Sequence, residues 1–212
     1  MRKQDRNVRI RAFRYDGDFY TYTAKIFDLV AANVLWLIGS LPVATAGASF
    51  CALYHVVVHS VRSGERTVFK EFWRVYRRDL KQSLAPWCFA LAMYFVLFLN
   101  LGILREQTPS LLILFFIVLF VFVLAGLTVV CCYLFPAIAT FAMPTKWQLR
   151  LALYLSIKHL PLSLLLIAMF AALYFSMLAV PLLVLALPSV FALFSSFLLE
   201  PVLAKHMPKD NE

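Results

Sequence analysis

Long apolar blocks constrain this 212-residue chain more than any other feature of its sequence. The longest blocks are residues 24–41, 84–104, 110–135 and 161–199. One helical crossing of a bilayer needs about 20 mainly apolar residues, so each block can supply at least one crossing. Hydrophobic residues form 63% of the chain and charged residues only 15%, whereas soluble domains carry about 25% charge. The sequence therefore predicts an all-α membrane protein, a polytopic bundle of transmembrane helices.

The number of crossings depends on two stretches. The block 161–199 is too long for one crossing, and Pro181 and Pro188 predict that it forms a hairpin of two helices. The stretch 43–61 is less apolar than the long blocks, because it contains two histidines and several small residues. If this stretch crosses as well, the total is six.

Basic clusters favour the six-crossing topology. Residues 1–22 contain six Lys or Arg, and residues 62–83 contain seven more. A crossing by 43–61 brings both clusters to one side, as the positive-inside rule requires. Every other Lys or Arg except Arg105 then lies on or near that side. We expect one membrane domain, 1–212, with both termini cytoplasmic and with a basic cytoplasmic segment at 1–22.

The segment NVLWLIGSLPVATAG, residues 33–47, has two possible interpretations. Ala44-Thr45-Ala46 resembles a signal-peptidase site, and a basic start is typical of a signal peptide. The preceding apolar run, however, is longer than the core of about 7–15 residues that signal peptides use. Its proline and glycine are typical of a tight turn. We expect an uncleaved helical hairpin.

Residues 66–83 predict a cytoplasmic amphipathic helix. At about 100° per residue, its aromatic side chains lie on one arc and its basic side chains on the adjacent arc. Such a helix lies at the interface on anionic lipid, or it docks a partner, because Trp, Tyr and Arg often anchor interfaces. The candidate docking residues are Phe69, Phe72, Trp73, Arg74, Tyr76, Arg77, Arg78 and Lys81.

Few polar side chains fall within the apolar blocks. Asn33 predicts a hydrogen bond between helices. His55 and His59 share one helical face with small residues, which favours close packing over a metal site. Asp28 and Glu200 lie near the cytoplasmic ends of the first and last crossings. No acid or base falls near mid-depth, and ion-coupled transport is therefore disfavoured.

The sequence contains no motif for catalysis or for a cofactor. We find no phosphate-binding glycine loop, no zinc-protease helix and no serine with an appropriate histidine and acid. The four cysteines lie in apolar blocks without metal or redox spacing. The chain has a net charge of +9, and its basic residues border the apolar blocks. This placement indicates contact with lipid headgroups and not with nucleic acid. We expect a protein without enzymatic activity, cofactor or metal.

Several motifs carry a family resemblance. They are NVLWLIGSLPVATAG, CALY, FKEFWRVYRRDLKQS, YLFPAIATF and LALYLSIKHLP. In order and spacing they resemble the YesL-like family of bacterial integral membrane proteins, a family of unknown function. The family often has Asn-Phe where this chain has Asp79-Leu80, and a basic residue at Thr140. The resemblance implies a multi-pass protein of the plasma membrane in Gram-positive bacteria, found with carbohydrate ABC importers.

Two classes of function follow from the sequence and the resemblance. The first is an accessory subunit of an oligosaccharide ABC importer, with the importer's permease subunits and the lipid bilayer as partners. The alternative is an autonomous channel or permease for a neutral solute, formed as an oligomer, or a membrane assembly or regulatory factor. A channel would need a polar stripe over the full depth of a crossing, and no block contains one. The sequence leaves the sugar and the oligomeric state open.

Overall fold

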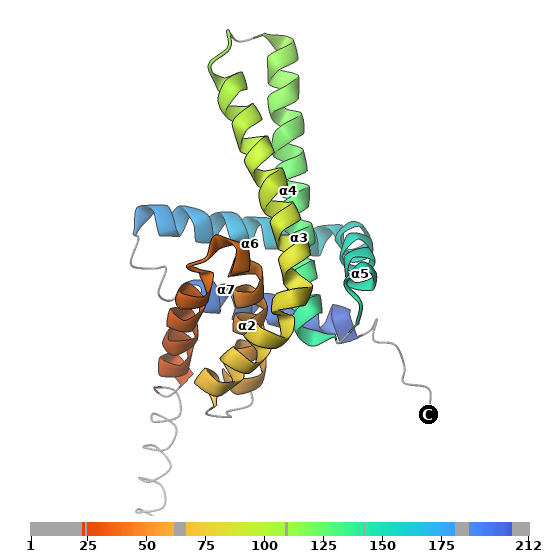
Figure 1. The fold of residues 1–212 in the computed structure, drawn as a ribbon. Helices are drawn as coiled ribbons and strands as arrows, with labels where there is room; N and C mark the ends of the chain where they lie inside the picture. Colours follow the sequence, from red (N-terminus) through yellow and green to blue (C-terminus); the bar gives the residue numbers. More distant parts are fainter. Residues whose placement is uncertain are drawn as a thin grey trace, which may run out of the picture.

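A computed structural model describes residues 23, 25–61, 67–108, 110–141, 143–180 and 187–204. Every regular element in this part of the chain is a helix (Figure 1). The expected all-α class is thereby confirmed. The basic segment 1–22 and Pro181, on which two of the predictions fall, lie outside the described residues.

The chain begins with an antiparallel helical hairpin, which we call the N-terminal hairpin. Its first helix covers residues 25–40, and a 3-10 turn at Val43–Thr45 leads into α2, Ala46–Val56. A π-helical turn, Val57–Val61, extends α2. The Thr45 hydroxyl donates to the carbonyl of Gly39 at 2.9 Å and to that of Pro42 at 2.8 Å. The tight turn expected between these helices is present.

The two longest helices form a second hairpin that projects from the rest of the molecule (Figure 1). They are α3, Val68–Arg105, and α4, Leu111–Thr140. With 38 residues, α3 is about 57 Å long. We call residues 88–105 and 111–128 the outer hairpin, and residues 68–87 the inner half of α3. The apolar side chains of the outer hairpin are largely exposed, as Phe95 and Phe122 illustrate.

Three further helices follow α4. They are α5, Thr145–Lys158, α6, Leu160–Ala179, and α7, Leu187–Ala204. The axes of α5 and α6 differ by 99°, and α6 lies across the α3–α4 pair (Figure 1). The two helices expected in the last apolar block are present as α6 and α7. Pro188, expected to break that block, lies in the first turn of α7, where a proline is tolerated.

By length and composition, two described helices can cross a membrane, namely α3 and α4. The count is three if α5 and α6 together form one bent crossing. Residues 43–59 and 187–203 form apolar helices that are shorter. The chain is thus an all-helical membrane protein with fewer full-length crossings in its described residues than the six that the sequence predicts.

Of the segment expected as a separate amphipathic helix, 66–83, residues 68–83 are part of α3. The helix runs without interruption through Pro86, although a proline removes one backbone donor. One face of the inner half packs on α2, and Phe72 and Val75 are fully buried there. The aromatic stripe expected from the sequence is therefore divided, with Phe72 in the protein's own core and Phe69 exposed.

The core is centred on α2, where Cys51, Ala52, Leu53 and Val56 are fully buried. Gly47 permits close packing at this centre. A Cβ atom added to Gly47 would lie 2.8 Å from Cβ of Trp87 and 3.0 Å from the Phe135 ring. The Trp87 indole N–H donates to the carbonyl of Val43 at 2.7 Å. Small residues thus bring α2, α3 and α4 together, as is common where helices pack in membranes.

Candidate functional site

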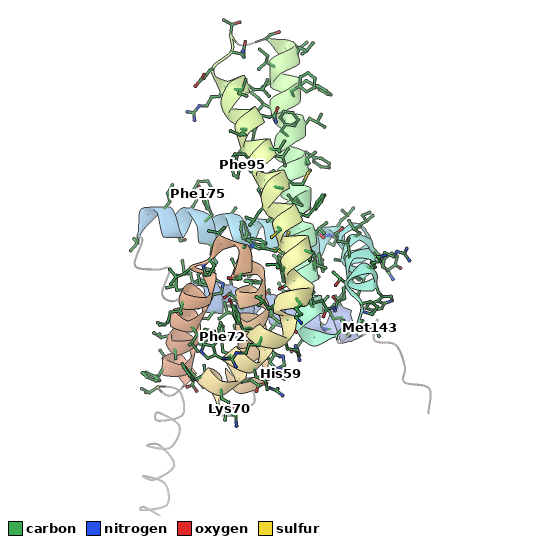
Figure 2. The ribbon with its side chains drawn as sticks, viewed as in Figure 1. His59, Lys70, Phe72, Phe95, Met143 and Phe175 are labelled. Atoms are coloured by element: carbon green, nitrogen blue, oxygen red, sulfur yellow. The ribbon has the colours of Figure 1, made fainter. Side chains whose placement is uncertain are left out.

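The predicted docking residues divide into exposed and inward-facing groups. The exposed group forms an open groove of about 740 Å³ on the inner half of α3. We call it the basic groove, and its lining residues are Phe69, Lys70, Trp73, Arg74 and Arg77. Figure 2 shows Lys70 at the end of the molecule away from the outer hairpin. These five residues therefore form one continuous surface. Lys70 is the one member that was not among the predicted docking residues.

The inward-facing group holds α3 against the N-terminal hairpin. Phe72 is fully buried and stacks on Tyr76, with ring centroids 6.1 Å apart and planes at 14°. The Tyr76 hydroxyl donates to the carbonyl of Gly39 at 3.4 Å. These two aromatic side chains make their contacts within the protein. Phe72 is therefore not part of the surface that a partner could contact, and Tyr76 is only partly exposed.

One predicted intramembrane residue, His55, meets a carboxylate from the next helix. Glu71 accepts a hydrogen bond from Arg74 and lies 3.1 Å from the Nε2 atom of His55. The His59 ring lies 4.2 Å from the His55 ring and is exposed. No group of three His, Cys, Asp or Glu side chains that could hold a metal occurs within the described ranges. Sequence reasoning missed Glu71 because the contact joins two helices.

A network that we call the polar junction ties α3 to the connection between α4 and α5. Arg78 donates from Nε to Oδ1 of Asp79 at 2.6 Å and from Nη2 to Oδ2 at 3.0 Å. Arg78 also donates to the Ala139 carbonyl at 3.2 Å. Asp79 is almost completely buried. The paired guanidinium compensates the cost of burying that carboxylate, since charged groups are buried only when paired.

Two amides complete the polar junction. Gln82 donates to Oε1 of Gln148 at 2.9 Å and to the carbonyl of Met143. Gln148 in turn donates to the Phe141 carbonyl at 2.8 Å and is fully buried. Asp79 and both glutamines were not among the predicted site residues. The sequence contained a signal for the burial of Asp79, because Asp79 lies seven residues after Phe72 and so on the same face of the helix.

A second hollow, the junction cleft, lies beside the polar junction and has a volume of about 520 Å³. Its walls come from α3, from the end of α4 and from the start of α5. The lining residues are Arg78, Asp79, Lys81, Gln82, Ile138, Phe141, Met143, Pro144 and Thr145. Lys81, a predicted docking residue, thus lines a different hollow from the basic groove, about two turns further along α3 from Arg74.

The expected hydrogen bond of Asn33 is confirmed. Its side-chain amide donates to the Ser189 hydroxyl at 2.7 Å, and the Ser189 backbone N–H donates to Oδ1 of Asn33 at 3.0 Å. Both residues are fully buried, so this pair fixes the start of α7 on the N-terminal hairpin. Asp28 and Glu200 are half-buried near the ends of their helices.

The charged and apolar surfaces lie at opposite ends of the α3–α4 pair. The basic side chains of the inner half of α3 and the first basic residues of α5 are at one end, whereas Arg105 is at the tip of the outer hairpin (Figure 1). Between these ends, the outer hairpin exposes Phe, Leu and Val side chains. Such an arrangement fits a protein whose outer hairpin is in lipid and whose basic end contacts headgroups and water.

One of three comparisons with known proteins found a match. Residues 29–101 match the family described as "Protein of unknown function, DUF624", to which the YesL-like proteins belong. The matched residues contain the N-terminal hairpin and most of α3. Neither a comparison with curated proteins nor one with solved structures found a match. By the match over residues 29–101, the chain is similar to the DUF624 family over about a third of its length.

Proposed function

We propose that this protein is a non-catalytic accessory subunit of a bacterial carbohydrate ABC importer in the plasma membrane, and that it binds the permease subunits. The basic groove is the observation that supports a docking role. The identity of the assembly, an importer of oligosaccharides, rests on the resemblance to YesL-like proteins.

The chemistry of the basic groove suits a protein partner. Phe69 is 68% exposed and lies next to the cations of the groove. Lys70 and Arg77 have no acidic partner among the described residues, whereas Arg74 is paired with Glu71. Exposed aromatic side chains beside guanidinium groups are typical anchors of interfaces. Unpaired cations favour a partner whose surface is acidic.

We also propose six crossings with both termini in the cytoplasm. The N-terminal hairpin and the α3–α4 pair each return the chain to the end at which they begin (Figure 1), and α6 and α7 supply the last two crossings. One contact constrains how the crossings are arranged. Trp87 contacts the turn of the N-terminal hairpin at Val43, so this hairpin lies beside the inner half of α3. A hydrocarbon core of about 30 Å contains both layers only if α3 is strongly tilted from the membrane normal, so six crossings require such a tilt.

Labelling of Leu41 tests the count. Leu41 lies at the turn of the N-terminal hairpin and is 78% exposed. In a cysteine-free background, six crossings predict that Leu41→Cys reacts with an impermeant maleimide in intact cells. Reaction only after permeabilisation would remove the first two crossings, and it would leave both termini on the cytoplasmic side.

Co-purification tests the proposed partner. We expect the tagged protein to bring down the permease subunits of a sugar importer in mild detergent, measured by quantitative mass spectrometry in cells grown on the relevant glycan. The double variant Phe69→Ala, Arg77→Gln should lose most of this recovery. The matched control Phe95→Ala, Arg105→Gln makes the same chemical changes at the outer hairpin and should keep it. Recovery of the protein without permease subunits would contradict the proposal.

A further inference from the structure

We propose that the junction cleft binds the headgroup of an anionic phospholipid from the surrounding bilayer, and that the acyl chains of this lipid lie along one face of α3. The proposal goes beyond partner docking. It uses a hollow whose lining shares no residue with the basic groove.

The open polar groups of the cleft favour an anion. Both carboxylate oxygens of Asp79 already accept hydrogen bonds from Arg78, so these two charges compensate each other. Lys81 is exposed and has no acidic partner among the described residues. The remaining donors that line the cleft are the unused Nη1 of Arg78 and the Thr145 hydroxyl. The cleft thus carries one uncompensated positive charge, with hydrogen-bond donors beside it.

The rest of the lining is apolar, which favours an amphiphile over a bare inorganic anion. Ile138, Phe141, Met143 and Pro144 form this part of the wall. Figure 2 shows Met143 on the side of the molecule below α5. An apolar wall gains nothing from a hydrated inorganic ion, but it can cover the glycerol and the first methylene groups of a lipid.

An exposed apolar face continues upward from the cleft. Phe89, Val96, Leu99 and Ile103 have exposed fractions of 66%, 51%, 51% and 60%. At about 100° per residue, these four side chains and the cations Arg78 and Lys81 lie within an arc of about 80° on α3. Phe89 lies about 12 Å above Lys81 along the helix axis. A lipid with its phosphate at Lys81 would therefore lay its acyl chains on this face.

The chemistry also fits the proposed orientation. Anionic lipids give the cytoplasmic leaflet its negative surface potential. The cleft lies at the basic end of the α3–α4 pair, where that leaflet's headgroups would be. Unlike diffuse attraction to a basic surface, a cleft of this kind predicts lipid retention that depends on particular side chains.

Native mass spectrometry of the purified full chain tests the site. The protein is extracted from nanodiscs that contain phosphatidylcholine with phosphatidylglycerol, and the lipids retained on each chain are counted. We expect phosphatidylglycerol to be retained in preference to phosphatidylcholine. Lys81→Gln should lower this retention about tenfold, because it removes a charge-assisted hydrogen bond. Lys70→Gln removes the same charge from the basic groove and should leave retention unchanged.

A second variant and a competitor keep the test decisive. Thr145→Val removes a hydroxyl without changing the charge, and it should lower retention by a smaller factor than Lys81→Gln. Equal losses for Lys81→Gln and Lys70→Gln would show diffuse attraction and would overturn the site. Equal retention of both lipids would overturn it too, as would displacement of the bound lipid by inorganic phosphate. Co-purification with permease subunits is a separate readout, so either proposal can fail alone.

Discussion

The inner and outer halves of α3 belong to one continuous helix, yet they have different surroundings. In the inner half, Phe72 is fully buried against the protein's own helices. In the outer half, Phe95 is 66% exposed, which is consistent with contact with lipid. Both halves are rich in aromatic residues. The comparison shows that an apolar stripe in a membrane protein does not by itself identify whether protein or lipid covers it.

Polar side chains differ between the halves in the same way. The inner half carries the polar junction, whose hydrogen bonds reach α4 and α5. Asn100 in the outer half donates only to the carbonyl of Val96, within its own helix, at 2.7 Å. We therefore expect substitutions in the inner layer to lower the free energy of unfolding and equivalent substitutions in the outer hairpin to change it little.

The largest effect is expected from truncating the same residue type in the two halves. Phe72→Ala leaves a cavity in a closed core and should lower the free energy of unfolding by about 3–5 kcal/mol. Phe95→Ala should change it by less than about 0.5 kcal/mol, because lipid or detergent fills the vacated space. SDS titration in mixed micelles measures both. Equal losses would mean that the outer hairpin packs against protein.

Adding one methyl group to each of two glycines should have intermediate effects on stability, and the two effects should have opposite signs. Gly47→Ala should cost about 1–3 kcal/mol, because the new Cβ would lie 2.8 Å from Cβ of Trp87, which cannot move away without its helix. A Cβ at Gly102 has no atom within 4 Å. Gly102→Ala should therefore raise stability by about 0.5–1 kcal/mol through helix propensity. Melting temperatures in detergent give both signs, and a stabilising Gly47→Ala would contradict the close packing of α2.

The smallest effect is expected from the two asparagines. Asn33→Ala removes two hydrogen bonds that fix the start of α7, and it should cost about 1–2 kcal/mol. Asn100→Ala should be neutral, because it leaves no buried partner unpaired. The same SDS titration compares the pair. If the two variants behaved alike, Asn33 would not hold α7 on the N-terminal hairpin.

Local sequence signals predicted the features that depend on one segment. Composition indicated an all-helical membrane protein, Pro42 and Gly47 indicated the turn of the N-terminal hairpin, and Asn33 indicated a hydrogen bond between helices. Each of these depends on helix periodicity or on turn chemistry.

The missed features depend on contacts between segments far apart in the sequence. Asp79 and Gln82 looked like part of a solvated basic helix, because their partners near residues 139–148 belong to other elements. Glu71 reaches His55 across two helices in the same way. Two prolines at the starts of apolar blocks also differ, since α3 passes through Pro86 whereas Pro161 follows a bend of 99°. Packing on α2 supports the helix around Pro86, and sequence patterns do not record such packing.

The account depends on the outer hairpin crossing the membrane with its basic end in the cytoplasm. Cysteine labelling in intact cells tests this directly, with Gln107→Cys at the tip and Lys70→Cys at the basic end, each in a cysteine-free background. We predict that an impermeant maleimide labels Gln107→Cys in intact cells and labels Lys70→Cys only after permeabilisation. Labelling of Lys70→Cys in intact cells would contradict the orientation, and with it the cytoplasmic docking surface.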